Sequence, residues 1–420
     1  MTTLAPPAGP RTKGTVLFVP GAPGTGTKRT VPFVPPSVPD HASLTGLRLF
    51  TSPDGPPPER SHGWLVDAAQ QVGLLGRGGA AFPVATKLRA VPRGARVLAN
   101  GSEGEPASWK DRQLMRHRPD LVIGGVQLVG KALASPEIVI AVNDAESADA
   151  LTRQAGEWGA QVEIREVDYG FVGGEIGALV NGLNGRRAVP DGRRRLPHIR
   201  GLGDQPTYAS NVETFARLGE LARLGPEEYA TLGSAREPGT SLVTRHWDGT
   251  IDVLEVTNGI RLGEIMPAGV GAILVGGYHG TWTTRTDLVL DRAWLRGQGI
   301  GWGAGVLAAL PNDTCPVGEV ARVARWLAGQ SARQCGPCLF GLDAIAGDLA
   351  DLARAEPVDL ARLRNRLALA PGRGACAHPT GVAGFVVSAL TAFADEVAHH
   401  AAGKLCGRPV RGALPIGETP

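Results

Sequence analysis

The chain has 420 residues, 43% of them hydrophobic, and at one domain per ~100–200 residues this length predicts two to four domains with buried cores. Its 43 Lys and Arg residues against 40 Asp and Glu leave a net charge of +3, too small over this length to indicate a nucleic-acid or polybasic membrane surface. The apolar stretch Val382–Ala394 is too short to span a bilayer and the first residues do not form a secretory signal, so we expect a cytoplasmic protein.

Residues 1–63 are rich in Pro, Gly and Thr and predict an irregular N-terminal arm, with VLFVPG and VPFVPP as alternative short strands. The segment GAPGTGTKRT places Gly21 and Gly26 at the spacing of a P-loop. Its Lys28 comes one residue late, however, and Arg29 stands where a hydroxyl should follow. Because a P-loop needs its amides, lysine and hydroxyl in fixed register, we do not expect one here.

Residues 64–235 mix predicted helices, short strands and glycine loops, which indicates an α/β domain. WLVDAAQQVGLLG predicts a helix that ends at a glycine, EIVIAV a strand, and MRHRPDLVIGGVQL a further helix. The string GRGGAA fits the dinucleotide pattern GxGxxA, but a predicted helix precedes it where that fingerprint requires a strand. Its glycines with Arg77 and the later Lys87 indicate an anion site, the alternative being a glycine turn with surface cations.

Residues 236–300 predict a small β-rich domain, because GTSLVTRHWDGTIDVLEVTNG alternates apolar and polar residues around an Asp-Gly turn. Residues 301–410 predict a bundle of about four helices with cysteines on its loops and helix ends, and 411–420 a tail. The apolar residues that recur there at intervals of three and four are Val317, Val320, Ala321, Ala324 and Leu327, then Leu342, Ile345, Leu349 and Leu352, then Phe385, Ala389, Phe393 and Val397. The expected fold class is multidomain α+β.

Three further polar loops follow the glycine segment. LANGSEGEPASWKDR carries Asn100 and Glu103, DYGFVGGEIGALVNGLNG carries Glu175, and YASNVETFARLG carries Asn211. GRGGAAFP with its later lysine resembles GRGGAGFP…K of the NADH-binding flavoprotein subunit of respiratory complex I. In the same order, NGSEGEP…KDR resembles NADEGEP…KDR of that family, GGEIGAL its GEETAL, and SNVET its NNVET. The resemblance extends over roughly residues 64–400.

The resemblance implies an α/β domain that binds FMN, a ubiquitin-like β-grasp domain in the β-rich segment, and an iron-sulfur site in a C-terminal four-helix bundle. Amides and a cation suit the phosphate of a flavin, while amide and carboxylate side chains suit its ring and hydroxyls. The residues implied to hold FMN are Gly76, Arg77, Gly78, Lys87, Asn100, Glu103, Gly174, Glu175, Ser210, Asn211 and Thr214. Solvated loop carboxylates are the alternative interpretation of Glu103 and Glu175.

Phe82 and Glu105 match positions that contact NADH in the family, but other positions depart from the pattern. Ala90 and Leu196 stand where the family has aromatic rings, and Ile176 replaces the second Glu of GEE. An aromatic contact contributes ~0.5–1.5 kcal/mol beyond its buried area, so we expect NADH binding to be weakened by roughly tenfold to a hundredfold. Ser102 likewise replaces the Asp of NADE, and FMN is better supported than NADH. The arginine cluster 186–195 is a site for a phosphate or acidic partner, or a solvated surface.

The five cysteines all lie in the last quarter of the chain, which favours ligands or redox groups over a disulfide framework. SARQCGPCLFG resembles the family's SCGxCxPCREG, whose cysteines bind a 4Fe-4S cluster with a fourth some forty residues on. Cys335, Cys338 and Cys376 match three of these, while the first is Ala332. The candidates for the missing ligand are Cys315, His378 and Cys406. CGPC is also the thioredoxin string, which requires a βαβ context that is not predicted here.

The expected function is electron transfer from NADH, or from a protein donor, through FMN to an iron-sulfur cluster and then to an iron-sulfur or membrane redox partner subunit. We expect no nucleic-acid partner, no transmembrane segment and a location in the cytoplasm, including the periphery of a membrane complex. No general base is needed for hydride transfer, so no catalytic side chain is predicted. A thiol-disulfide oxidoreductase using CGPC and a non-catalytic assembly subunit are the alternatives.

Overall fold

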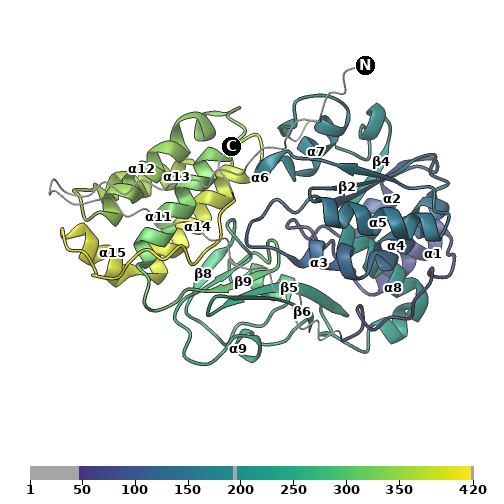
Figure 1. Ribbon diagram of the computed structural model, residues 1–420, viewed down its shortest axis with the longest axis horizontal. Coiled ribbons are helices and arrows are strands. Elements are labelled where there is room, and N and C mark those ends of the chain that lie inside the picture. Colours follow the sequence, from purple (N-terminus) through teal and green to yellow (C-terminus); the bar gives the residue numbers. More distant parts are fainter. Residues whose placement is uncertain (1–46, 193–195, 418–420) are drawn as a thin grey trace, which may run out of the picture.

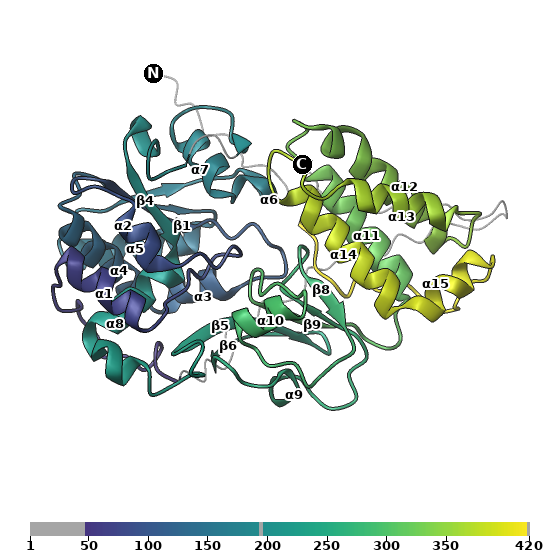
Figure 2. The same ribbon diagram turned by 180° about the vertical axis from the view of Figure 1, so that it is seen from behind.

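The computed structural model describes residues 47–192 and 196–417, so the proline-rich segments and the candidate P-loop of the first 46 residues lie outside the described residues. Figures 1 and 2 show a parallel-sheet domain and a helical domain on opposite sides of the molecule, with a mixed sheet along one edge between them. Among the described residues no single helix is long and apolar enough to cross a membrane, and only one helix pair, bent by 87°, passes that test when its two helices are combined.

The N-terminal domain is built on a parallel sheet in the order β3-β2-β1-β4. Its strands are β1 (Arg96–Gly101), β2 (Ile138–Val142), β3 (Glu163–Glu166) and β4 (Thr207–Asn211). Its helices are α1 (His62–Gln71), α2 (Val84–Arg89), α3 (Lys110–His117), α4 (Pro119–Leu133), α5 (Ala145–Glu157), α6 (Gly170–Gly173), α7 (Ile176–Leu183) and α8 (Val212–Tyr229), with a 3-10 turn at Leu202–Asp204. Consecutive residues of β1 and β2 are buried, so both faces of these strands are covered, which is typical of parallel sheets.

The predicted helix across MRHRPDLVIGGVQL is wrong in one respect, since the structure divides it into α3 and α4. Arg118 leaves the helical region with φ −136° and ψ 55°. The residue before a proline disfavours helical dihedrals, whereas Pro119 suits the first position of the next helix. The predicted helix before the glycine segment is confirmed as α1, which ends at Gln71, two residues before Gly73.

The mixed sheet has the order β6-β5-β9-β7-β8, with β5 and β9 parallel and the other neighbours antiparallel. Its elements are β5 (Thr240–Trp247), β6 (Thr250–Thr257), α9 (Leu262–Ile265), β7 (Ile273–Val275), β8 (Thr281–Thr283), α10 (Arg292–Gly297) and β9 (Val306–Ala309). The predicted Asp-Gly hairpin is confirmed, because Asp248 and Gly249 both have positive φ, as a tight two-residue turn requires. The central strand β9 lies beyond the expected domain limit at residue 300, because its short apolar run carries no strand signal of its own.

The C-terminal part is helical and comprises α11 (Pro316–Gly329), α12 (Leu342–Ala353), α13 (Leu360–Leu369), α14 (His378–Ala392) and α15 (Ala394–Ala401). A short π-helical turn, Pro337–Gly341, leads into α12. The apolar spacing from Phe385 to Val397 predicts one helix, but the chain bends by 87° between α14 and α15 at Phe393. The bend turns α15 back against α11, α12 and α14.

Candidate functional site

The predicted flavin loops meet at the carboxyl end of the parallel sheet. The chain moves outward from β1 through β2 to β3, whereas β4 lies on the other side of β1. The order therefore reverses between β1 and β4, and such a switch point is where open α/β sheets bind ligands. Asn100 and Asn211 are paired in register at the ends of these two strands, and Asn211 Nδ2 donates to the Asn100 carbonyl over 3.3 Å.

The glycine loop between α1 and α2 is tied to the start of α8. The Arg77 amide donates to Thr214 Oγ1 over 2.8 Å, and Gly78 lies against Asn211. The Arg77 guanidinium points into the core instead, where it is 1% exposed and lies 3.4 Å from Glu237. Its side chain therefore anchors the loop, and only its backbone is left to face a flavin.

Lys87 provides the cation of this loop. Its Nζ donates to the Ala209 carbonyl over 3.3 Å, next to the buried Ser210 at the end of β4. Burial lowers the pKa of Lys87. In the described part of the chain no carboxylate pairs with it, so a half-buried ammonium at the switch point lacks its counter-ion. A phosphate meets that requirement, and the residues therefore fit the phosphate end of FMN.

The second glycine turn touches both halves of the site. Gly174 accepts a hydrogen bond of 2.9 Å from Asn100 Nδ2, and its backbone lies against the Ser102 carbonyl. The exposed Glu175 caps α7 by accepting from the amide of Ala178 over 3.0 Å. In Figure 1, α6 and this turn lie at the junction of the parallel-sheet domain and the helical domain. The second glycine turn thus lies between the flavin loops and the helical domain that carries the cysteines.

A cleft of ≈ 190 Å³ opens beside these loops. It is lined by Ser102, Glu103, Gly104, Pro106, Arg112, Asn143, Asp168, Tyr169, Gly170, Phe171, Trp326, Gln330 and Gly417. Glu103 is buried and accepts from Ser108 Oγ over 2.5 Å and from the amides of Asp111 and Arg112 over 3.2 Å, so it also fixes the start of α3. The interpretation of Glu103 as a solvated carboxylate is therefore wrong.

Glu105 is a largely buried acid next to the cleft. Its Oε2 accepts from the Tyr278 amide over 2.9 Å. Burial, aided by the charge of Glu103, outweighs the amide donors and raises the pKa of Glu105 to about 7. Because this value lies above the ordinary 4.5, folding holds a proton on Glu105 between these two pH values, and stability falls as pH rises through that window.

Glu105→Gln is expected to raise stability by about 1–3 kcal/mol at pH 8 and to change it little at pH 4, because glutamine keeps an acceptor for Tyr278 without the charge. The measurement is the thermal midpoint of both proteins at the two pH values. Glu157→Gln, at an exposed position on α5, serves as the control. An equal shift at both pH values would contradict a titrating Glu105.

A buried ion network beneath the loops was not foreseen from the sequence. Glu213 lies 3.1 Å from Lys110 and 3.5 Å from Arg217, and Lys110 lies 2.6 Å from Asp111. Burial alone would raise the pKa of Glu213, but Lys110, Arg217 and Arg77 outweigh it and lower that pKa to about 2. The charged residues of the KDR and VET motifs thus hold α3, α8 and the glycine loop in fixed relation. The KDR and VET motifs were the sequence features from which this network could have been expected.

Cys335, Cys338 and Cys376, the three predicted cluster ligands, lie together. Burial first, and then the neighbouring thiols of Cys335 and Cys376, raise the pKa of Cys338 to about 12. The His378 amide donates to Cys376 just before α14 begins, and the Glu175 carboxylate lies near enough to help burial raise the pKa of Cys376. Three neighbouring cysteine thiols are the kind of donors that iron-sulfur clusters take. The donor set therefore fits an iron-sulfur cluster.

The structure separates the three candidates for the missing ligand. Both ring nitrogens of His378 are engaged, at 2.9 Å from His279 Nε2 and 3.0 Å from the Leu327 carbonyl. Cys315 begins α11 and lies with Cys406, whereas the cluster cysteines follow the other end of that helix. Fourteen residues of helix span about 21 Å, so neither cysteine reaches the cluster. The positions of Cys315 and Cys406 and the hydrogen bonds of His378 therefore do not favour these candidates as its fourth ligand.

Ser331, which sequence reasoning missed, lies closer. Its hydroxyl oxygen is buried and has no well-formed hydrogen bond among the described residues. It lies beside the Cys338 thiol. Ser331 immediately precedes Ala332, the position at which the first cysteine is missing. An oxygen donor thus stands beside the gap in the thiolate set.

The thioredoxin interpretation of CGPC is not supported by its surroundings. Cys335 follows α11 and Cys338 lies in the π-helical turn before α12, so the motif does not lie in a βαβ unit. None of the five cysteines, all within the described ranges, forms a disulfide.

Three of the positions compared with the family's NADH contacts lie at the surface, whereas Glu105 is largely buried. Phe82 and Leu196 are 46% and 47% exposed, and Ala90 is an exposed residue at the end of α2. Ile176 is the first residue of α7, beside Glu175. Of the arginine cluster, Arg186 pairs with Asp204 at 2.7 Å, while residues 193–195 lie outside the described residues.

Comparisons with known proteins match residues 69–220 to the Nuo51 FMN-binding domain and residues 319–400 to the NADH-ubiquinone oxidoreductase-F iron-sulfur binding region. The NADH-quinone oxidoreductase-F protein of Mycobacterium tuberculosis is 28% identical over 388 residues, which cover 81% of this chain and 85% of that protein. Its Escherichia coli counterpart is 27% identical over 397 residues, covering 84% and 85%. A chain of the NAD+-reducing NiFe hydrogenase in its H2-reduced state gives a TM-score of 0.73 at 25% identity, and the match covers 81% of this chain and 63% of that one.

The fold, the loops and the cysteine set define an oxidoreductase that binds a flavin and an iron-sulfur cluster. All residues predicted to hold FMN fall within the matched FMN-binding region, and the three cysteines fall within the matched iron-sulfur region. The chain contains the FMN-binding and iron-sulfur binding regions of complex I flavoprotein subunits and is an NADH dehydrogenase-like electron-transfer protein. The resemblance, cofactors and class of function predicted from the sequence are confirmed, and the thiol-disulfide alternative is not favoured.

Proposed function

We propose that this chain takes electrons from NADH at an FMN bound over the ends of β1 and β4, and passes them to a cluster on Cys335, Cys338 and Cys376. The observation that carries this proposal is the position of the second glycine turn. Gly174 is bonded to Asn100 of the flavin loop, while the Phe171 amide donates to Gln330, which ends α11 just before the cysteine segment, over 3.2 Å. A short connection between flavin and cluster follows from these contacts.

The protein's part is to bind and orient. Lys87 neutralises the phosphate, while Asn100, Asn211 and Glu175 present amide and carboxylate groups to the rest of the flavin. Bound FMN supplies the exchange between two-electron and one-electron transfer. The buried network around Glu213 keeps the loops in place, so the flavin's surroundings need no rearrangement during turnover.

For the cluster, we infer three thiolate ligands and Ser331 as the oxygen donor beside the fourth position. Amide donation from His378 to Cys376 and the start of α14 both favour negative charge on the sulfur. Ala332 leaves the cluster one thiolate short, which makes it more labile than a cluster with four cysteines.

We infer three functional domains, with flavin binding in residues 64–235, a ubiquitin-like β-grasp domain beginning at 236, and the iron-sulfur domain extending to 410. The parallel pairing of β5 with β9 at the centre of the mixed sheet supports the β-grasp assignment. Because the matched relatives are named as subunits of NADH-quinone oxidoreductase, we propose a redox partner subunit as the electron acceptor, with this chain at the periphery of its complex.

We expect NADH to bind more weakly than in a family member with aromatic residues at positions 90 and 196. Ala90→Phe combined with Leu196→Phe is expected to strengthen NADH binding by roughly tenfold to a hundredfold, because both positions are exposed and accept a ring without a core clash. The measurement is the NADH concentration that half-reduces the flavin in anaerobic titration. Leu369→Phe, exposed on α13, is the control. Tight NADH binding in the unmodified protein would contradict the roles assigned to these positions.

The proposal as a whole is tested by one anaerobic absorption spectrum of the purified chain, reconstituted with FMN, before and after NADH. The expected result is bleaching of the flavin bands followed by loss of the broad cluster absorbance. A colourless protein that binds no FMN would favour the assembly-subunit hypothesis. Flavin bands that respond to dithionite but not to NADH would show that another donor is used.

A further inference from the structure

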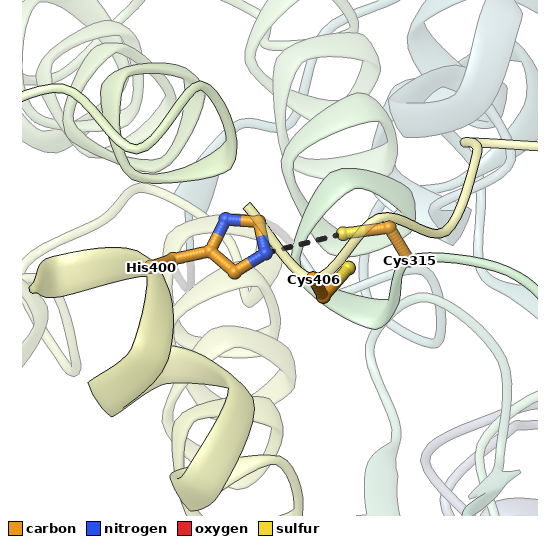
Figure 3. Close-up of side chains that lie close together, drawn as sticks. All are labelled: Cys315, His400 and Cys406. Carbon is orange, nitrogen blue, oxygen red and sulfur yellow. Dashed lines mark hydrogen bonds between the residues drawn. The ribbon is translucent and has the colours of Figure 1, made fainter. Parts of the chain in front are cut away.

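Cys315, His400 and Cys406 form a group that the electron-transfer pathway does not use. Their sulfur and nitrogen ligand atoms all lie within 4.8 Å of one another, and Cys315 Sγ is 3.7 Å from His400 Nε2. Figure 3 shows the imidazole of His400, in the last turn of α15, directed at the two sulfurs. The three residues come from the start of α11, the end of α15 and the segment that follows α15.

The orientation of His400 is fixed by a hydrogen bond. Its Nδ1 lies 3.0 Å from the Leu352 carbonyl, and because a carbonyl only accepts, Nδ1 carries the proton. Nε2 is then left with a lone pair that faces the sulfur of Cys315. Metal-binding histidines are held in this way, with the second ring nitrogen donating to a backbone carbonyl or carboxylate. His400 is 1% exposed, so water is kept from this ring.

The sulfur of Cys315 lies where a backbone amide and a helix start can support a metal-bound thiolate. The Gly318 amide donates to Cys315 Sγ over 3.4 Å, and the positive end of α11 lies at the same sulfur. Apolar residues close the site on the protein side, among them Val317, Leu352 and Val397. Two thiolates in such a place need a cation between them.

We propose that Cys315, His400 and Cys406 bind one Zn²⁺ ion, with a water molecule as the fourth ligand. Two thiolates and one imidazole are donors that suit Zn²⁺ and exclude Mg²⁺ and Ca²⁺, which take oxygen ligands. No fourth His, Cys, Asp or Glu joins the group among the described residues, and the partly exposed Cys406 lets a water reach the ion. Binding releases one proton from each thiol, and the two thiolates balance the charge of the ion.

The ion would clamp the C-terminal segment onto the helical domain. This segment already pairs with the start of α11, because the Cys315 amide donates to the Pro409 carbonyl over 2.8 Å. Farther along, Glu319 Oε1 accepts from the Gly412 and Ala413 amides over 2.7 and 3.0 Å. A zinc ion adds a cross-link between residues 85 positions apart in the chain, Cys315 and His400. The site is thus structural and stands independently of the flavin and the cluster.

The test is the zinc content of the full-length protein, purified anaerobically with reductant, offered equimolar Zn²⁺ and desalted. We expect one zinc per chain in the unmodified protein, and at least a tenfold loss in Cys406→Ser and His400→Gln. His399→Gln, at the exposed neighbouring histidine, and Cys376→Ser, in the cluster, are expected to keep their zinc. Cys406→Ser changes a partly exposed side chain, so it reports on the site even where His400→Gln fails to fold.

X-ray absorption at the zinc edge then identifies the ligands without interference from flavin or iron. The expected shell has two sulfurs at about 2.3 Å and nitrogen or oxygen at about 2.0–2.1 Å. Equal zinc in the unmodified protein and Cys406→Ser, iron in place of zinc, or a Cys315–Cys406 disulfide in the reduced preparation would each overturn the proposal. Because zinc is counted separately from flavin, iron and sulfide, failure here leaves the electron-transfer proposal standing.

Discussion

Cys338→Ser is expected to abolish the iron-sulfur cluster while leaving FMN binding intact. Cys338 is the most buried of the three cysteines that lie together, and a serine oxygen is a much poorer iron ligand than a thiolate. Because position 332 holds Ala instead of the family's first cysteine, only two cysteine ligands would remain. The flavin loops pack on a different hydrophobic core and should keep their cofactor. The measurements are iron, acid-labile sulfide and flavin per chain, with the low-temperature spin signal of the reduced protein.

Two matched variants sharpen this result. Cys406→Ser should retain iron and sulfide, because Cys406 lies with Cys315 at the opposite end of α11. Ala332→Cys should lengthen the lifetime of the cluster in air, because it restores the missing thiolate beside Ser331. If anaerobic preparations hold neither iron nor sulfide and instead form a reversible disulfide between Cys335 and Cys338, the thiol hypothesis is correct.

Much of the flavin site could be predicted because its residues lie in short, ordered motifs. Strand ends that hold Asn100 and Asn211, and glycine turns such as the one at Gly174, follow local rules of turn and cap formation. The Asp248–Gly249 hairpin is of the same kind, since the turn residues alone select it. In each case the information is contained within a few consecutive residues.

What could not be predicted depends on contacts between distant segments. The charge of Arg77 is paired in the core with Glu237, which lies far along the chain, whereas Lys87 has no carboxylate partner among the described residues. The residues next to Arg77 and Lys87 in the sequence do not reveal this difference. Likewise His400 is brought to Cys315 only by the bend between α14 and α15, which interrupts a continuous apolar pattern. Periodicity cannot reveal such a bend when both helices keep the same apolar face.

Lys87→Ala is expected to weaken FMN binding by about tenfold to 150-fold, because hydrogen bonds to charged groups contribute ~1.5–3 kcal/mol. The ammonium is half-buried beside the Ala209 carbonyl, burial lowers the pKa of Lys87, and no described carboxylate offsets its charge. Without flavin, removal of such a cation should leave stability unchanged or slightly higher, since the cost of burying it disappears. The measurements are the FMN dissociation constant, from quenching of flavin fluorescence, and the thermal midpoint of the flavin-free protein.

The opposite signs of these two effects separate a ligand from a structural residue. A lysine that only holds the fold together would lower the thermal midpoint of the flavin-free protein when it is removed, and FMN affinity would fall as a consequence. Lys131→Ala is the matched control, because Lys131 is exposed and pairs with Glu59 at 2.7 Å. Lys87→Arg, which keeps the charge, should recover part of the lost affinity. Full FMN affinity in Lys87→Ala would place the phosphate elsewhere, and the switch-point site would then have to be given up.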